Sequence, residues 1–443
     1  MAVQKFFGKE AMPFLEPGFV ISEIQMISGE NTEKKLCIFA IYSIDFRGLE
    51  FSRKNQSCLN LQINQHESAR KKTMNNLTAI VNQFNTGGEV ISVIPFGSGH
   101  INDSYLVTTT PESAPDYVLQ RINHRIFSNV PELTNNILMV TRHLRQKLAC
   151  KSADLDYFQV IGLTPTKTGS FFFHDHEGNY WRLYNHVSGS TSYDTVVSSG
   201  LAFEGGKAFG VFQYLASDID ASLLYEVLPD FHNIATRLAT FRETISRDPA
   251  GRVKEVEKEI GFIEARSAEM HTILHLGQRG EIPLRVTHND TKFNNVLFNT
   301  GNKAISVVDL DTVMPGYILY DFGDAIRTGA STGAEDDRDL SAVHIDLDLF
   351  EAYARGYLGI ASRFLNKTEI DNLAFSAKFM TYIIGLRFLT DHIDGDRYYK
   401  IGFPGHNLQR ARAQFRLLQS MEHHYSSMQE IIVRITKPGY QQS

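Results

Sequence analysis

The chain lacks the features that would place it among disulfide-rich, zinc-binding or membrane proteins. It has only three cysteines in 443 residues, Cys37, Cys58 and Cys150, and they form no Cys-x-x-Cys pair. A disulfide framework and a thiolate zinc site are therefore not expected, and a reducing cytoplasm is the expected compartment. The best early apolar run, residues 36–42, is far shorter than the roughly 20 residues that a membrane-spanning helix needs, so no membrane partner is expected either.

An excess of basic charge is also missing. The 44 basic and 50 acidic side chains leave a net charge of −6, and the pI is near 6.2. Because there is no basic block, we expect no nucleic-acid partner. Hydrophobic residues make up 42% and charged residues 21%, which excludes a disordered, collagen-like or coiled-coil chain. At about 100–200 residues per domain, the length predicts two or three structural units.

Residues 1–73 differ from the rest of the chain. They contain polar stretches and no sustained helical period, and their one strand-like segment is residues 35–44. A clean helical spacing of apolar residues begins only after Met74 and stops at the glycines 87–88. We therefore expect residues 1–73 to be an extra segment that precedes the natural start at Met74.

Residues 74–187 combine strand patterns with helical ones. Two strand-like runs surround the segment 96–104, which is rich in glycine and serine and predicts a hairpin. A helix with Pro131 in its first turn follows. Together these patterns predict a small α+β unit, with strands at 90–95, 105–110, 117–122, 170–174 and 180–187 and a helix at 131–148.

Residues 188–443 read as mostly helical. The exception is the segment 284–310, where loops and short strands are expected and where the chemically distinctive residues gather. Helical periods cover residues 203–216, 233–245, 253–276, 346–357, 370–389 and 408–432. We expect a second domain here that carries the catalytic and acceptor-binding residues.

The strongest chemical signal is the segment 288–295, His-Asn-Asp-Thr-Lys-Phe-Asn-Asn, together with the acidic end of the strand that follows. Asp290 precedes Asn295 by five residues, and Asp309 follows fourteen residues later. Phosphoryl transfer needs such a set, because one carboxylate takes the proton of the attacking hydroxyl while an amide and a second carboxylate hold Mg²⁺ on the nucleotide phosphates. Lys292 can reach the transferring phosphate. Each residue alone is more often a turn or strand cap, but the joint spacing favours the catalytic interpretation.

A second signal is the glycine-containing segment 96–104. Glycines allow backbone N–H groups to approach phosphate oxygens, which a Cβ would block. Hairpin turns are also rich in Gly and Ser, so this segment is informative only together with the catalytic one. We expect a lid over the nucleotide phosphates formed by Gly97, Ser98, Gly99, His100 and Asn102.

The strands of the small unit should supply the remaining nucleotide contacts. Arg121 of the third strand is the candidate cation, and Glu132 is its candidate partner because it is the only acidic residue in the helix that follows. A surface arginine and a first-turn glutamate favoured by the helix dipole are the alternative. The strand at 180–187 should end in a hinge whose backbone pairs with adenine, which assigns Asn185 and Val187 to the nucleotide site.

Two polar clusters among apolar residues, at 320–327 and 387–396, are candidates for the acceptor site. Sugar hydroxyls are recognised by Asp, Arg and Asn side chains, although buried Arg–Asp pairing would also explain both clusters. The substrate candidates are Arg327, Arg387 and Asp391, with His232 and Arg237 from an upstream segment and Asp290 as the base that meets the acceptor.

The catalytic segment resembles that of a known superfamily. His288, Asp290, Asn295 and Asp309 match the catalytic core of the aminoglycoside phosphotransferase and choline kinase superfamily. The match runs from about Met74 to the C-terminal helix. Within the superfamily, several stretches resemble the N-acetylhexosamine 1-kinases: residues 99–102 (Gly-His-Ile-Asn), 118–123 (Val-Leu-Gln-Arg-Ile-Asn), 308–316 (Val-Asp-Leu-Asp-Thr-Val-Met-Pro-Gly), 320–324 (Tyr-Asp-Phe-Gly-Asp) and 387–391 (Arg-Phe-Leu-Thr-Asp).

The resemblance implies an α+β, bilobal, protein-kinase-like fold. A small antiparallel-sheet N-lobe would cover residues 74–187 and a larger, mainly helical C-lobe residues 188–443, with ATP between them and Mg²⁺ as its metal. By position, Asp290 becomes the catalytic base, and Asn295 and Asp309 become the metal ligands. The implied reaction is phosphoryl transfer to the anomeric hydroxyl of an N-acetylhexosamine, which gives a sugar 1-phosphate and ADP. The implied partners are therefore a nucleotide and a small sugar.

Two positions depart from the superfamily pattern, and two other functions stay open. Gln120 stands where the third strand usually carries its Lys or Arg. Lys292 stands where many antibiotic kinases carry His, and this difference argues against an aminoglycoside as the acceptor. A kinase for another small alcohol, of the homoserine, choline or aminoglycoside type, would differ only in its acceptor pocket. A non-catalytic nucleotide-binding regulator is the alternative from another class, and it would normally have lost the base or a metal ligand.

Overall fold

The computed structural model describes residues 76–97, 101–150 and 155–437. All of them belong to one compact unit, residues 71–443. The predictions for residues 1–73, including the strand at 35–44 and the start at Met74, lie outside the described residues. So do Ser98, Gly99 and His100 of the expected phosphate loop.

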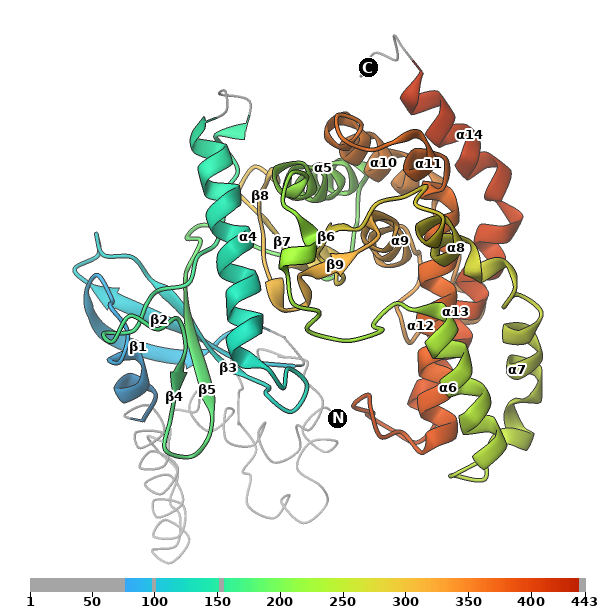
Figure 1. The fold of residues 1–443 in the computed structure, drawn as a ribbon, viewed down its shortest axis with the longest axis horizontal. Helices are drawn as coiled ribbons and strands as arrows, with labels where there is room; N and C mark the ends of the chain where they lie inside the picture. Colours follow the sequence, from blue (N-terminus) through green and yellow to red (C-terminus); the bar gives the residue numbers. More distant parts are fainter. Residues whose placement is uncertain (1–75, 98–100, 151–154, 438–443) are drawn as a thin grey trace, which may run out of the picture. The chain divides into compact units, whose positions relative to one another are not determined.

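An antiparallel five-stranded sheet forms the N-terminal part of the described chain (Figure 1). Its strand order is β1-β2-β3-β5-β4, with β1 at Glu89–Pro95, β2 at Asp103–Thr110, β3 at Tyr117–Ile122, β4 at Phe173–His174 and β5 at Tyr180–Asn185. Gln120 of β3 lies directly opposite Arg182 of β5, and Arg121 lies opposite Trp181. Because directly opposed residues share a face of a sheet, Gln120 and Arg182 point the same way.

The two faces of the sheet pack against different cores. One face packs against the helical turn at 76–81, and this small core consists of Leu77, Val81, Phe84, Val93, Val107, Tyr117, Leu119, Trp181 and Leu183. The other face lies toward helix α4, Val130–Cys150, whose buried side chains join the large core that extends through the helical part. Helix α4 therefore connects the sheet to the helices, as its amphipathic spacing predicts.

The C-terminal part is built from helices and short ribbons (Figure 1). Its helices are α5 at Ser199–Ala216, α6 at Ile234–Arg247, α7 at Glu257–Glu264, α8 at Thr272–Gln278, α9 at Ile318–Gly329, α10 at Leu347–Ala361, α11 at Lys367–Asp371, α12 at Leu373–Asp394, α13 at His406–His423 and α14 at Tyr425–Thr436. Helix α12 packs against α6, α9 and α13. It is long and apolar enough to cross a membrane, but 89% of that apolar window is buried inside the protein, so its apolarity serves the core.

The strands predicted at 90–95, 105–110, 117–122 and 180–187 and the helix at 131–148 are confirmed, and the strand predicted at 170–174 is reduced to Phe173–His174, whereas several helix predictions were wrong. The single helix expected at 253–276 is interrupted between α7 and α8, and the one at 408–432 is divided at His424. Val256, Ile263 and Met270 are all buried, so the apolar pattern continues across the break and does not reveal it. Residues 320–327, interpreted as a polar cluster, lie in α9, whose acidic and basic side chains are buried along with its apolar ones.

Candidate active site

Two short antiparallel ribbons position the catalytic segment. Strand β6 (Arg285–Thr287) pairs with β9 (Met314–Gly316), and β7 (Val296–Phe298) pairs with β8 (Ala304–Val307). The segment 288–295 therefore connects β6 to β7, and residues 308–313 connect β8 to β9. The imidazole Nε2 of His288 donates to the Val308 carbonyl oxygen at 2.9 Å, and the Thr312 hydroxyl donates to the His288 carbonyl oxygen at 2.6 Å. These bonds join the loop that carries Asp290 to the loop that carries Asp309.

A buried carboxylate on α9 fixes the start of the catalytic loop. Asp321 accepts the backbone N–H groups of His288 at 2.8 Å and Asn289 at 2.7 Å, and the side-chain amide of Gln213 at 2.7 Å. Burial raises the pKa of Asp321, and the charge and hydrogen bonds of its partners oppose that shift. Asn289 adopts a left-handed backbone with φ 63°, a conformation that asparagine tolerates better than most residues. The turn that places Asp290 is thus held by backbone groups.

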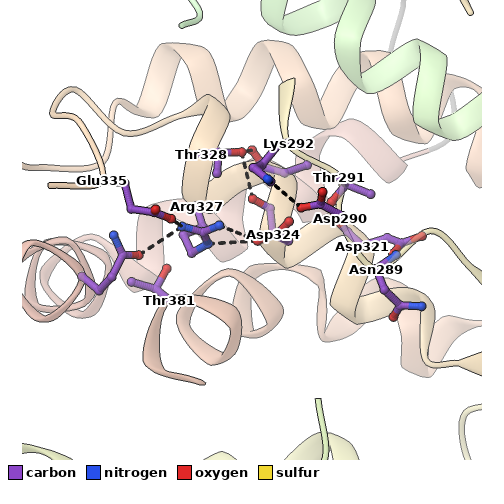
Figure 2. Close-up of polar contacts among 12 residues, drawn as sticks. Asn289, Asp290, Thr291, Lys292, Asp321, Asp324, Arg327, Thr328, Glu335 and Thr381 are labelled. Atoms are coloured by element: carbon purple, nitrogen blue, oxygen red, sulfur yellow. Dashed lines mark hydrogen bonds and ion pairs between the residues drawn. The ribbon is translucent and has the colours of Figure 1, made fainter. Parts of the chain in front are cut away.

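Asp290 lies between a cation, Lys292, which Figure 2 shows beside it, and the amide of Asn295. Its Oδ1 is 3.2 Å from the Nζ of Lys292. Asn295 Nδ2 donates to the Asp290 carbonyl oxygen at 2.8 Å and lies 3.3 Å from Oδ2. The Asp290 charge raises the pKa of Lys292 although burial opposes the shift, so the lysine is positively charged at neutral pH. The sequence-predicted base, its lysine and one predicted metal ligand are therefore brought together.

Asp309 is a carboxylate crowded by other carboxylates. It follows β8 with a left-handed backbone, φ 60° and ψ 63°. The residue is exposed to solvent. Desolvation and the charges of Asp311 and Asp290 raise its pKa to about 7, while Arg182 and Lys292 oppose the shift. A divalent cation bound beside Asp309 would balance this crowded negative charge.

Asn295 and Asp309 are neighbours across the β7–β8 ribbon, because the Val308 N–H donates to the Asn295 carbonyl oxygen at 2.9 Å. One amide oxygen and one carboxylate fit Mg²⁺, which usually keeps several waters and takes only one or two carboxylates from the protein. No group of three or more His, Cys, Asp or Glu side chains suited to a metal occurs in the described part of the chain. The Asn295–Asp309 pair has only one such side chain, the Asp309 carboxylate, so it does not form a group of this kind.

Arg182 of β5 is the charged residue that sequence reasoning missed. Its side chain is 1% exposed, and Nη1 lies 2.5 Å from Asp311 Oδ1. Its Nε and Nη2 donate to the Gln120 Oε1 at 3.0 and 2.8 Å. Asn102, the last residue of the expected phosphate loop, donates to the other Asp311 oxygen at 2.7 Å. An arginine within an apolar strand was the available signal, since such a charge is rarely buried without a function or a partner.

The predicted Arg121–Glu132 pair is wrong. Arg121 is exposed and forms its ion pair with Asp103 of the neighbouring strand β2, while Glu132 lies in the first turn of α4. Side chains alternate between the faces of a strand. Gln120 consequently points toward Arg182, and Arg121 points to the opposite face.

The other predicted nucleotide residues lie at loop and strand ends. Gly97 follows β1 with φ 77°, in the left-handed region that favours glycine. Asn185 ends β5, and its N–H donates to the Gly162 carbonyl oxygen at 3.1 Å. Val187 is buried, and its carbonyl oxygen accepts the Ser190 hydroxyl at 2.6 Å. Both of these residues lie where the sheet leads into the helical part, as a hinge requires.

Arg327 of α9 is paired with two carboxylates close to the catalytic loop (Figure 2). Its guanidinium lies 2.8 Å from Asp324 Oδ1 and 2.7 Å from Glu335 Oε1. Burial raises the pKa of Asp324, and Arg327 opposes the shift. Both carboxylates in turn raise the pKa of Lys292. Buried ion pairing, the alternative that the sequence left open, therefore describes the contacts of Arg327.

Asp391 holds a loop and does not pair with Arg387. Its two oxygens accept the backbone N–H groups of Arg397, Tyr398 and Tyr399 at 2.9, 2.8 and 2.9 Å. The side-chain amide of Asn407 donates to it at 2.9 Å. The carboxylate is thus occupied by the segment that follows α12.

Arg387, Arg237 and His232 form a cationic and aromatic cluster. Arg387 is largely buried and pairs with no carboxylate in the described residues. Arg237 donates to the Phe231 carbonyl oxygen, and burial followed by the Arg387 charge lowers its pKa. Burial and the same Arg387 charge lower the pKa of His232 well below its usual value; its Nε2 lies 3.4 Å from the Asn289 carbonyl oxygen. The Arg387 guanidinium carbon lies 4.7, 5.8 and 5.7 Å from the ring centres of Phe231, Tyr398 and Tyr399.

A sheet followed by a helical part, with an Asp–Lys–Asn loop beside a second Asp loop, defines a small-molecule phosphotransferase. A family model described as the phosphotransferase enzyme family matches residues 92–359, and the chain belongs to this family. Its structure is similar to the aminoglycoside phosphotransferase of Alicyclobacillus acidocaldarius subsp. acidocaldarius DSM 446, with 12% identity, a TM-score of 0.53, and coverage of 80% of this chain and 96% of that one. This likeness confirms the predicted α+β, bilobal, protein-kinase-like fold.

Two kinase structures are similar at lower scores. The microcompartment-associated aminopropanol kinase has 14% identity and a TM-score of 0.49, with coverage of 80% of this chain and 98% of that one. The amicoumacin kinase hAmiN has 12% identity and a TM-score of 0.49, with coverage of 76% and 92%.

Proposed function

We propose that the protein is an ATP- and Mg²⁺-dependent kinase that phosphorylates the anomeric hydroxyl of an N-acetylhexosamine. The products are the sugar 1-phosphate and ADP, and the cytoplasm is the proposed compartment. The observation that carries the kinase assignment is the position of Asp290 between Lys292 and Asn295, with Asp309 on the adjoining loop. A binding protein without turnover would have no need of this assembled set.

The proposed mechanism gives each of these residues separate work. Asp290 orients the acceptor hydroxyl and takes its proton as the oxygen attacks the γ-phosphorus. Lys292 balances charge on the phosphoryl oxygens during the transfer. Asn295 and Asp309 would hold Mg²⁺, which neutralises phosphate charge when it is bound. Most of the rate enhancement is then positioning and electrostatic stabilisation.

The acceptor side favours a neutral polyol over a cationic alcohol. A choline or aminoglycoside site needs free carboxylates or an aromatic and acidic cage around the ammonium group. Here Asp391 is occupied by backbone N–H groups, and Asp324 and Glu335 are occupied by Arg327. What stays available is the Arg387 guanidinium among aromatic rings, which suits the hydroxyl and N-acetyl oxygens of a sugar and its apolar ring face.

The test is an ADP-release assay with N-acetylglucosamine, N-acetylgalactosamine, galactose, homoserine, choline and kanamycin as acceptors. We expect turnover with the two N-acetylhexosamines and none with Asp290→Asn. Turnover only with homoserine, choline or kanamycin would end the sugar-kinase proposal. Nucleotide binding without turnover on any acceptor would favour the regulator instead.

The acceptor contact is tested separately with Arg387. Arg387→Met should raise the KM for the sugar and leave the KM for ATP near its original value. Arg363→Met, on the segment after α10, serves as the control. An unchanged sugar KM in Arg387→Met would remove this residue from the acceptor site.

A further inference from the structure

A buried polar cluster joins the sheet to the loop that carries Asp309, and the proposed mechanism does not use it. Arg182 and Asp311 form its centre, with side chains 1% and 4% exposed. Gln120 and Asn102 complete it through the hydrogen bonds described above. The cluster draws on β3, β5, the start of β2 and the β8–β9 connection, so four separate parts of the chain meet in it.

Three members of the cluster, Gln120, Asn102 and Arg182, each have a further contact. Gln120 Nε2 donates to the Ser104 hydroxyl at 3.0 Å, which turns its oxygen toward Arg182. Asn102 Oδ1 accepts the Asn123 backbone N–H at 2.9 Å, which turns its amide toward Asp311. The Arg182 guanidinium carbon lies 5.1 Å from the centre of the Tyr184 ring. Such consistent orientation indicates a built site and not a chance ion pair.

The cluster compensates for the neutral residue on β3. Gln120 cannot supply the positive charge that this strand position usually provides, and Arg121 points to the opposite face. Arg182 is opposite Gln120 in the sheet register and binds its side-chain oxygen. The positive charge is therefore present on the same face of the sheet, one strand further along.

We propose that Arg182 is the positioning cation of the nucleotide site, in place of a β3 lysine or arginine. By pairing with Asp311, it holds the turn that presents Asp309 to the Mg²⁺–nucleotide. Through Asp311 it also holds Asn102, the last residue of the expected phosphate loop, against the same turn. This proposal rests on the nucleotide and metal part of the proposed function and does not depend on which acceptor is used.

The experiment measures Mg·ATP binding by calorimetry, without any acceptor, together with melting temperature. Arg182→Met alone leaves Asp311 buried without its cation, which is strongly destabilising and could prevent folding. The double variant Arg182→Met/Asp311→Asn removes both charges and keeps an amide that Asn102 can still bond. We expect it to fold and to bind Mg·ATP about 10- to 100-fold more weakly, which is the usual loss when the residues supporting a metal ligand are removed.

An exchange variant tests whether the charge itself matters. Arg182→Gln/Gln120→Arg moves the guanidinium back to β3 and keeps Asp311 as its partner. It should bind Mg·ATP more tightly than Arg182→Met/Asp311→Asn and recover a large part of the lost affinity. The Mg²⁺ concentration required for half-maximal ATP binding should shift in parallel.

The control is a half-buried ion pair elsewhere in the helical part. Arg266 binds Glu422 at 2.7 Å, and Arg266→Met/Glu422→Gln should lower the melting temperature without altering Mg·ATP affinity. Wild-type Mg·ATP affinity in Arg182→Met/Asp311→Asn would overturn the proposal. So would a folded exchange variant that binds Mg·ATP no better than Arg182→Met/Asp311→Asn. Because no acceptor is present, neither result bears on the sugar assignment.

Discussion

The loop at 288–295 and the face of the sheet that carries Arg182 hold their polar residues in place by different means. In the loop, the proposed base, its lysine and the proposed amide ligand lie within residues 288–295, and backbone N–H bonds to Asp321 fix the turn. On the sheet, Asn102, Gln120, Arg182 and Asp311 meet only through strand register and side-chain contacts. The first arrangement is visible as a sequence motif, and the second exists only after folding.

The two regions should also respond differently to substitution. The chemistry of the loop depends on single side chains whose positions the backbone fixes, so a conservative change should affect rate and leave the fold intact. The cluster on the sheet depends on mutual pairing of buried groups, so a single change should affect both stability and nucleotide binding. The predictions below test that difference, beginning with the largest effect.

Asp290→Asn should lose turnover by about 10²- to 10⁴-fold, the usual contribution of general-base assistance. Mg·ATP affinity should persist because Asn295 and Asp309 are unchanged. Steady-state rates and calorimetric titration measure the two quantities, with Asp371→Asn on α11 as the control. Loss of nucleotide affinity would show that the loop residues do not act separately.

Lys292→Ala should lower kcat by about 10²- to 10³-fold, as expected for loss of one group that stabilises developing charge. The KM values for both substrates should change much less, because the lysine acts mainly in the transition state. Steady-state kinetics of Lys292→Ala measure kcat and both KM values. A raised sugar KM with an unchanged kcat would instead make Lys292 a ground-state acceptor contact.

Asp309→Asn should weaken metal-dependent nucleotide binding by at least about tenfold, since it replaces a charged ligand by a neutral one. Raised Mg²⁺ should recover part of the loss. The measurement is Mg·ATP titration at several Mg²⁺ concentrations, compared with Asp290→Asn. Normal affinity here, with affinity lost in Asp290→Asn, would exchange the two roles.

Asp321→Ala should destabilise the protein because it leaves the buried N–H groups of His288 and Asn289 without acceptors. The expected cost is about 1–3 kcal/mol for each unsatisfied donor, measured by urea denaturation. The exposed Asp371→Ala serves as the control for loss of a carboxylate. Unchanged stability would mean that the catalytic turn does not depend on this anchor.

His232→Gln should alter the pH dependence of stability, the smallest effect considered. Burial, followed by the Arg387 charge, holds the folded-state pKa of His232 well below its unfolded value of about 6.5. A depressed pKa contributes stability above the unfolded pKa, and that stability is lost as pH falls. Melting temperatures between pH 7 and pH 5 should therefore fall less in His232→Gln than in the original protein. The exposed His176→Gln should show the original pH dependence.

The sequence by itself was sufficient for the sheet strands, helix α4 and the catalytic loop. Strands and amphipathic helices show their period locally, and Asp290, Lys292 and Asn295 are neighbours in sequence. Helix α9 was missed because its charged residues Asp321, Asp324 and Arg327, which recur every three positions, were interpreted as a binding cluster and not as one face of a helix. The break between α7 and α8 was missed because the buried positions continue in phase across it.

Only the tertiary structure decided that Arg182 supplies the buried positive charge of the sheet. It also decided which groups the acceptor candidates contact. Alternation along β3 placed Gln120, not Arg121, on the face of the sheet that carries Arg182, and antiparallel register brought Arg182 opposite it. Asp391 is occupied by the loop after α12, and Arg327 pairs with Glu335 beyond the end of α9, which the spacing of residues along the chain could not indicate; only the Arg327–Asp324 pair, three residues apart, was open to sequence reasoning. The physical reason is that the partner of a buried charge is determined by which distant segments pack together, whereas a turn or a strand is determined largely by its own neighbours.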